Sequence, residues 1–146
     1  MTFFTKKRLR NIQIFWAIFI GVGAYFGAYM MISDPSGVKF GMDPMLPYFQ
    51  NLPFADKLFQ NFLIPGILLL FINGITNTLS AIFLITNNKL GAISGLCCGI
   101  ILMLWISVQF IIFDFNIMSI LYFIFGFLQA LNAWMLLKKN GINVHI

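Results

Sequence analysis

The sequence predicts an all-α integral membrane protein, a four-transmembrane-helix antiparallel bundle with an extracytoplasmic loop between the first and second helices. Three observations predict this fold. Hydrophobic residues make up 60% of the 146-residue chain, and charged residues make up only 9%. Four apolar stretches exceed the length of about 18 residues that separates a membrane span from a buried core helix. The length suits one domain, so we expect a single membrane domain over residues 1–146.

The expected spans contain no Asp, Glu, Lys, Arg or His, and they are residues 12–32, 62–86, 90–113 and 117–137. Because a helix rises about 1.5 Å per residue, each is long enough to cross a hydrocarbon layer of about 30 Å. Continuous apolar runs are unlike the alternating strands of an outer-membrane barrel. The first run is too long for the hydrophobic part of a cleaved signal peptide, so we expect it to be retained.

Basic residues are distributed unevenly between the two sides of such a bundle. The side of the termini and of the 87–89 connection carries Lys6, Lys7, Arg8, Arg10, Lys89, Lys138 and Lys139. The opposite side carries Lys39 and Lys57 together with all four acids, Asp34, Asp43, Asp56 and Asp114. This positive-inside pattern predicts a multi-pass protein of the cell (cytoplasmic) membrane with the N- and C-termini cytoplasmic.

The net charge of +5 is explained by this topology, so we expect the lipid bilayer as partner and no nucleic acid. An orientation signal is the favoured role of the basic run "KKRLR", residues 6–10. A second role, holding anionic lipid headgroups, stays open.

The outer loop, residues 33–61, is the only long segment outside the spans. Its "DPSG" sequence predicts a tight turn, since Asp34 can accept hydrogen bonds from following amides and Gly37 tolerates a positive φ. Prolines at 44, 47 and 53 exclude a long helix there. The following "FADKLFQNF", residues 54–62, predicts a short amphipathic helix that caps the bundle, with its apolar face formed by Phe54, Leu58 and Phe62.

The connections at 87–89 and 114–116 are so short that spans two, three and four must be antiparallel neighbours. Glycines then recur at four-residue spacing on two of the spans: Gly23 and Gly27 in the first, and Gly91, Gly95 and Gly99 in the third. Small residues on one helix face allow close backbone approach. We therefore expect a tight contact between spans one and three, within one chain or across a dimer.

Carboxamides occur deep inside two spans. Asn73 and Asn77 share a face of the second span, and Gln129 and Asn132 lie at comparable depth on the fourth. Because an amide that faces hydrocarbon is costly, we expect these side chains to turn inward. They either join helices by hydrogen bonds or line a polar patch for a lipid-like ligand. Hydroxyls in the second span are expected to bond the carbonyl one turn earlier; they are Thr76, Thr78 and Ser80.

Trp105 and Gln109 lie one turn apart in the outer half of the third span. Two interpretations stay open for them. They line the mouth of a pocket beneath the 33–61 loop, or they pack against that loop and bond its backbone. The adjacent Cys97 and Cys98 do not form a CxxC pair and point about 100° apart, so we interpret them as small packing residues.

No sequence motif assigns a catalytic residue, a metal ligand or a cofactor. The chain lacks HExxH, GxSxG, P-loop and dinucleotide-binding patterns, and its single histidine is His145. The spans also lack the ionisable groups of a proton relay. Cation binding by the four acids is the remaining option for chemistry, and solvated loop acids are favoured over it. An enzyme is the third functional class in our ranking, after an accessory protein and a ligand-binding protein, and the sequence leaves it undecided.

Taken in order, "DPSG", "FG", "LPF", "LIPG", "NG" and "WISVQ" resemble a group of small four-span bacterial membrane proteins of unknown function. The resemblance extends from about residue 21 to residue 137. It implies a bacterial cell-membrane location and a compact four-helix domain. It implies no activity, cofactor or ligand.

The leading functional expectation is an accessory protein that associates through its glycine faces with itself or with a larger membrane protein. The alternative is a binder or carrier of a small lipophilic molecule. Its candidate ligand-binding residues are Asn73, Asn77, Gln129 and Asn132, with Trp105 and Gln109 at the mouth.

Overall fold

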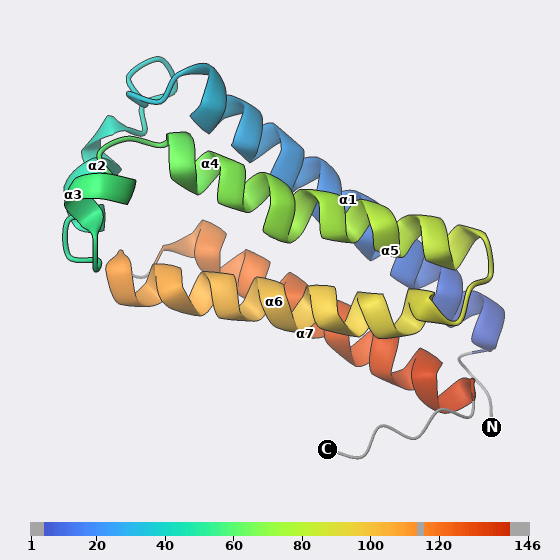
Figure 1. Ribbon diagram of the computed structural model, residues 1–146. Helices are drawn as coiled ribbons and strands as arrows, with labels where there is room; N and C mark the ends of the chain where they lie inside the picture. Colours follow the sequence, from blue (N-terminus) through green and yellow to red (C-terminus); the bar gives the residue numbers. More distant parts are fainter. Residues whose placement is uncertain (1–4, 114–115, 141–146) are drawn as a thin grey trace.

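The computed structural model describes residues 5–113 and 116–140, and within them the chain is helical with no β-strand (Figure 1). Four columns make up the bundle. The first is α1 (Lys6–Ser33), the third is α6 (Leu90–Ile112) and the fourth is α7 (Ile117–Lys139). The second column is built from α4 (Leu63–Leu69), η2 (Leu70–Ile75) and α5 (Thr76–Ile85). Each column is long and apolar enough to cross a bilayer, as the sequence predicts.

Helix α1 begins six residues before the expected span because capping, and not hydropathy, decides where a helix starts. Thr5 precedes the helix, and its hydroxyl accepts a hydrogen bond from the amide of Arg8 at 3.2 Å. Asn116 caps α7 in the same way, accepting from the amide of Ser119 at 2.9 Å. The first turns of α1 therefore carry the basic residues on a regular helix.

The columns are arranged so that α1 packs along the second column and along α7, while α6 packs along α5 and α7 (Figure 1). The predicted antiparallel order of spans two, three and four is confirmed. Helices α1 and α6 lie on a diagonal and do not pack along each other. The tight contact expected between spans one and three is confined to Gly95, whose added Cβ would lie 2.5 Å from the amide nitrogen of Gln13. The first residues of α1, the last residues of α7 and the connection between α5 and α6 lie together at one end of the bundle, which we call the terminal end (Figure 1). Helices α2 and α3 lie at the opposite end, which we call the loop end.

The three glycines of α6 are buried, and each faces a different column. A Cβ built on Gly99 would lie 2.6 Å from the backbone nitrogen of Ala130 in α7. One built on Gly91 would lie 2.9 Å from the side chain of Leu84 in α5, and one on Gly95 would meet α1. The stripe is used in packing inside the bundle, because only a residue without a side chain fits at these contacts.

Helix α1 shows why a four-residue spacing does not identify the contact by itself. Gly23 and Gly27 are half-buried, and a Cβ on either would lie 3.0 Å from a side-chain atom of α7 or α4 respectively. The buried glycine of this helix is Gly21, whose added Cβ would lie 3.4 Å from the Cβ of Asn77. The close approach of α1 to the second column thus occurs at a glycine outside the predicted pair.

The predicted turn at the start of the outer loop is confirmed. Gly37 has a φ of +76°, which suits a residue without a side chain. The amide of Lys39 donates to one carboxylate oxygen of Asp34 at 2.8 Å, and the hydroxyl of Ser36 donates to the other at 2.6 Å. The Ser36 bond, followed by the Lys39 bond, lowers the pKa of Asp34 below its ordinary value.

The amphipathic helix predicted over residues 54–62 is wrong. A single turn, α3 (Ala55–Leu58), forms there; the 3₁₀ turn η1 (Asp43–Met45) and α2 (Leu46–Phe49) precede it. Phe54 has a left-handed φ of 60° and is exposed, so it cannot begin a helix that buries it.

Phe62 is the one member of the predicted face that is buried, and its ring packs at 5.7 Å from the ring of Phe49. Phe49 also lies against Phe59 at 5.8 Å and against Phe113 of the α6–α7 connection at 5.3 Å. Aromatic packing across the loop end therefore overrides the local helical periodicity.

Candidate functional site

Five carboxamides are buried at the centre of the bundle, and we call them the amide cluster. They are Gln13 of α1, Asn73 of η2, Asn77 of α5, and Gln129 and Asn132 of α7; none has more than 5% of its surface exposed. The prediction that the amides of the apolar spans turn inward is confirmed for all four residues to which it was applied. Hydrocarbon offers an amide no hydrogen bonds, so such side chains are stable only against polar atoms of the protein or of a bound molecule.

One part of the amide cluster joins α7 to the second column. The amide nitrogen of Gln129 donates to the side-chain oxygen of Asn77 at 2.8 Å. Asn77 in turn donates from its own amide nitrogen to the backbone carbonyl of Asn73 at 2.7 Å. Both polar atoms of Asn77 are thereby satisfied. A bond of this kind between membrane helices contributes about 0.6–2 kcal/mol.

A second part joins α7 to α1. The amide nitrogen of Asn132 donates to the side-chain oxygen of Gln13 at 2.7 Å and to the backbone carbonyl of Leu9 at 2.9 Å. Gln13 is a site residue that the sequence analysis missed. The signal was present, since Gln13 lies inside the first apolar span and the rule applied to the other amides applies to it equally.

Asn73 differs from its neighbours in the amide cluster. It is 1% exposed, yet neither its amide nitrogen nor its side-chain oxygen has a hydrogen-bond partner among the described residues. It lies in η2, where the helix widens to π-helical hydrogen bonding. Such single wide turns occur frequently at functional sites. A buried amide left without partners destabilises the fold by about 1–3 kcal/mol.

The close packing beside Asn73 comes from the next residue. A Cβ built on Gly74 would lie 3.1 Å from the ring of Tyr25, so α1 approaches η2 closely at this level. The hydroxyls of Tyr25 and Thr78 are 2.6 Å apart and are hydrogen-bonded to each other. The packing of Tyr25 against Gly74 in η2 and its hydrogen bond to Thr78 in α5 thus hold the second column against α1.

The hydroxyls of the second column follow the prediction in two of three cases. Thr76 and Thr78 each bond the carbonyl one turn earlier, that of Ile72 and of Gly74 respectively. Ser80 instead donates to the carbonyl of Gly91 in α6 at 3.4 Å, so it links two helices where a bond within its own helix was also available to a hydroxyl.

Trp105 and Gln109 have helices as partners. The side-chain oxygen of Gln109 accepts a hydrogen bond from the hydroxyl of Ser119 in α7 at 3.2 Å. Of the two interpretations left open for Gln109, a bond to the loop backbone is not the one made by this oxygen, which accepts from α7 instead. Trp105 is half-buried and packs against a cluster formed by Ile20, Leu102 and Ile106.

The cysteines and acidic residues considered as candidates for chemistry do not form a site among the described residues. Cys98 is buried, Cys97 is exposed, and both are free thiols. Within residues 5–113 and 116–140, no three side chains of His, Cys, Asp or Glu come together in a way that could hold a metal ion. Asp114 and His145 lie outside the described residues.

No family model, no curated protein and no solved structure matches the chain. The amide cluster is therefore the feature from which function is inferred.

Proposed function

We propose that the chain is a multi-pass protein of the cell membrane, with both termini in the cytoplasm, that binds a small lipophilic molecule carrying one polar group. Four apolar helices support the membrane location. The charge distribution supports the orientation, because basic residues outside the spans are retained on the cytoplasmic side. Seven of the nine basic residues lie at the terminal end of the bundle.

The unpaired carboxamide of Asn73 is the observation that carries the ligand-binding proposal. Asn77 and Asn132 already have partners within the chain, so they hold the helices together. Asn73 offers one donor and one acceptor that the described residues leave unused. A ligand group that both donates and accepts, such as a hydroxyl or an amide, would satisfy both atoms and remove the cost of burying them.

The composition of η2 favours an otherwise apolar ligand. The other residues of η2 are Leu70, Phe71, Ile72, Gly74 and Ile75, none of which has a polar side chain. An apolar body in such surroundings is held by burial, and one hydrogen-bonded group fixes its orientation. The amide cluster then has two roles: paired amides fix the helix positions, and Asn73 receives the ligand.

An accessory protein that associates with itself or with a larger membrane protein is the second candidate. Gly23 and Gly27 face side chains of α7 and α4 within the chain, so such an interface would use the exposed face of α1 beside them. Large exposed side chains next to them on α1, including Val22 and Phe26, offer apolar contact area. Lipid covers such a surface equally well, so we rank this candidate below ligand binding.

Native mass spectrometry of the protein, gently solubilised from its membrane, tests the proposal. We expect a small-molecule adduct on the wild type that is absent from Asn73→Leu. The matched control is Asn51→Leu, the same exchange at an exposed position of the outer loop, and it should keep the adduct.

A wild-type chain without an adduct, or an adduct that Asn73→Leu retains, would refute the ligand proposal. A stoichiometric protein partner that is lost from Phe26→Ala, an exchange at an exposed position of α1, would support the accessory candidate instead. Both measurements come from the same preparation.

A further inference from the structure

A pocket of about 730 Å³ opens at the terminal end, and we call it the basic pocket. Its cations come from two segments that are far apart in sequence: Lys6, Lys7 and Arg10 from the first turns of α1, and Lys89 from the connection between α5 and α6. No acidic side chain is among the described residues that line it. Four positive charges around one concave space create a positive potential that attracts anions.

The guanidinium of Arg10 makes one hydrogen bond at this pocket. One of its terminal nitrogens donates to the side-chain oxygen of Asn87. The Nε of Arg10 is buried and has no partner among the described residues. A guanidinium bonded at one edge keeps further N–H groups for an oxyanion, and that bond restricts the freedom the side chain loses when an anion binds.

Asn140 adds an acceptor to these donors. Its side-chain oxygen is buried and without a partner in the part of the chain that the structure describes, although the residue lines the basic pocket. An unused acceptor beside cations suits a ligand with a hydroxyl or a protonated oxygen next to its anionic group.

The floor of the basic pocket is apolar. Leu84, Ala92 and Leu136 line it, and they belong to a hydrophobic cluster that also contains Leu9 and Leu137.

We propose that the basic pocket binds a phosphate-bearing anion. Its source is either the headgroup of an anionic phospholipid or a small soluble phosphate compound. Basic pockets between membrane helices at the cytoplasmic side are known to hold anionic headgroups. This site is separate from Asn73 and uses no member of the amide cluster.

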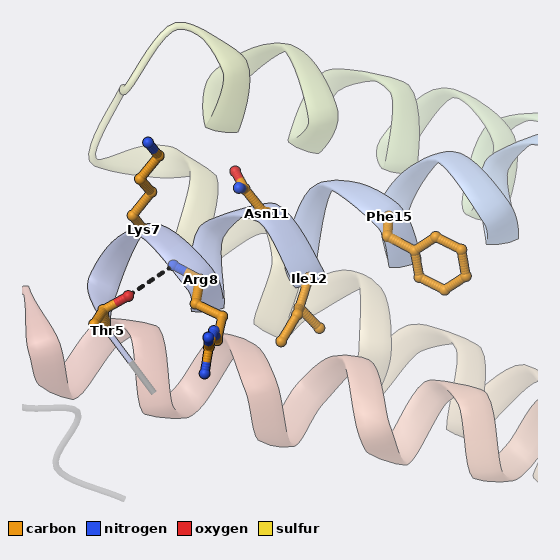
Figure 2. A pocket seen from close by; sticks show the side chains of 6 residues that line it. All are labelled: Thr5, Lys7, Arg8, Asn11, Ile12 and Phe15. Carbon is orange, nitrogen blue, oxygen red and sulfur yellow. Dashed lines mark hydrogen bonds between the residues drawn. The ribbon is translucent and has the colours of Figure 1, made fainter. Parts of the chain in front are cut away.

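Helical geometry divides the basic run at residues 6–10 between two surfaces. Figure 2 shows that Lys7 and Arg8 point to opposite sides of α1. Arg8 faces a second, shallower groove of about 460 Å³, which shares Lys7 with the basic pocket and is bordered by Ile12 and Phe15. Phosphate recognition is therefore assigned to the side of α1 that carries Lys7 and Arg10, and not to the whole run.

Titrations of the purified chain in a non-ionic detergent test this assignment. The thermal midpoint is followed with three probes: dioctanoyl phosphatidylglycerol, dioctanoyl phosphatidylcholine and inorganic phosphate. We expect a saturable rise with phosphatidylglycerol and none with phosphatidylcholine. Lys89→Gln should weaken the apparent affinity about fivefold, since one basic residue near an anionic surface contributes about 1 kcal/mol. Lys89 is exposed, so its exchange leaves the packing intact.

Lys139→Gln is the matched control, because it removes one exposed charge at the same end of the bundle outside the basic pocket. Its affinity should equal that of the wild type. A response to phosphatidylglycerol alone identifies a lipid headgroup, whereas an equal response to inorganic phosphate identifies a soluble phosphate compound. The proposal fails if neither probe exceeds phosphatidylcholine, or if Lys139→Gln weakens binding as much as Lys89→Gln.

Discussion

Asn77 and Asn73 are the same residue type, one turn apart on one helix face and equally buried, yet their surroundings differ. Both polar atoms of the Asn77 side chain have partners: its oxygen accepts from Gln129 across the bundle, and its nitrogen donates to the backbone carbonyl of Asn73. Asn73 has a partner for neither. Burial of a polar side chain is therefore not sufficient to identify a structural hydrogen bond or a binding site. The partner on the opposite helix decides between them.

The largest effect is expected when the paired amide is removed. Asn77→Leu should lower the free energy of unfolding by about 2 kcal/mol, because it breaks the bond to α7 and leaves the amide nitrogen of Gln129 unsatisfied, as the oxygen of Gln129 already is in the wild type. Thermal unfolding in detergent would show this as a midpoint lower by about 4–8 °C.

The double variant Asn77→Leu, Gln129→Leu sharpens this test. Replacing both partners with apolar groups removes the unsatisfied atoms, so the double variant should be more stable than Asn77→Leu alone. Equal loss in the single and double variants would show that the Asn77 to Gln129 bond is not what the mutation breaks.

An intermediate effect is expected where a glycine borders the other amide pair. A Cβ at position 95 would lie 2.5 Å from the amide nitrogen of Gln13, so Gly95→Ala should displace the Gln13 side chain from Asn132. We expect a loss of about 1 kcal/mol, measured in the same thermal assay.

Gly21→Ala is the matched control, since Gly21 is also buried in a helix but its added Cβ would meet its neighbour at an ordinary 3.4 Å. Alanine is the better helix former, so this variant should be as stable as the wild type or slightly more stable. If the two variants lost equal stability, the contact between Gly95 and Gln13 would not be the cause.

The sequence predicted the helices and the buried face of the second column because both follow from hydropathy and helical periodicity. It did not predict which amides pair. Asn132 was expected to turn inward, with no partner named, and it bonds Gln13 of α1. Pairing depends on which helices are neighbours, and short connections fix that order only for spans two to four. Glycine spacing placed the first span beside the third, whereas α1 packs along the second column and α7.

The loop end was predicted less well for a related reason. The turn at Asp34 and Gly37 is determined by local hydrogen bonds and a local backbone angle, and it formed as expected. The helix proposed for residues 54–62 was inferred from spacing alone. Its one buried aromatic, Phe62, is held by rings that are distant in sequence, and no local pattern contains that contact.

The smallest effect on stability is expected at Asn73. Asn73→Leu removes no hydrogen bond of the described side chains and replaces a buried amide with an apolar group of similar size. Its free energy of unfolding should therefore lie within about 0.5 kcal/mol of the wild type, or be higher, when no ligand is present. A ligand that binds only the folded chain adds stability to the wild type in proportion to its occupancy. Protein prepared directly from membranes should then show the wild type as the more stable of the two, and delipidated protein should not. A loss at Asn73→Leu as large as that at Asn77→Leu in delipidated protein would mean that Asn73 is a structural amide, and the difference between the two positions would disappear.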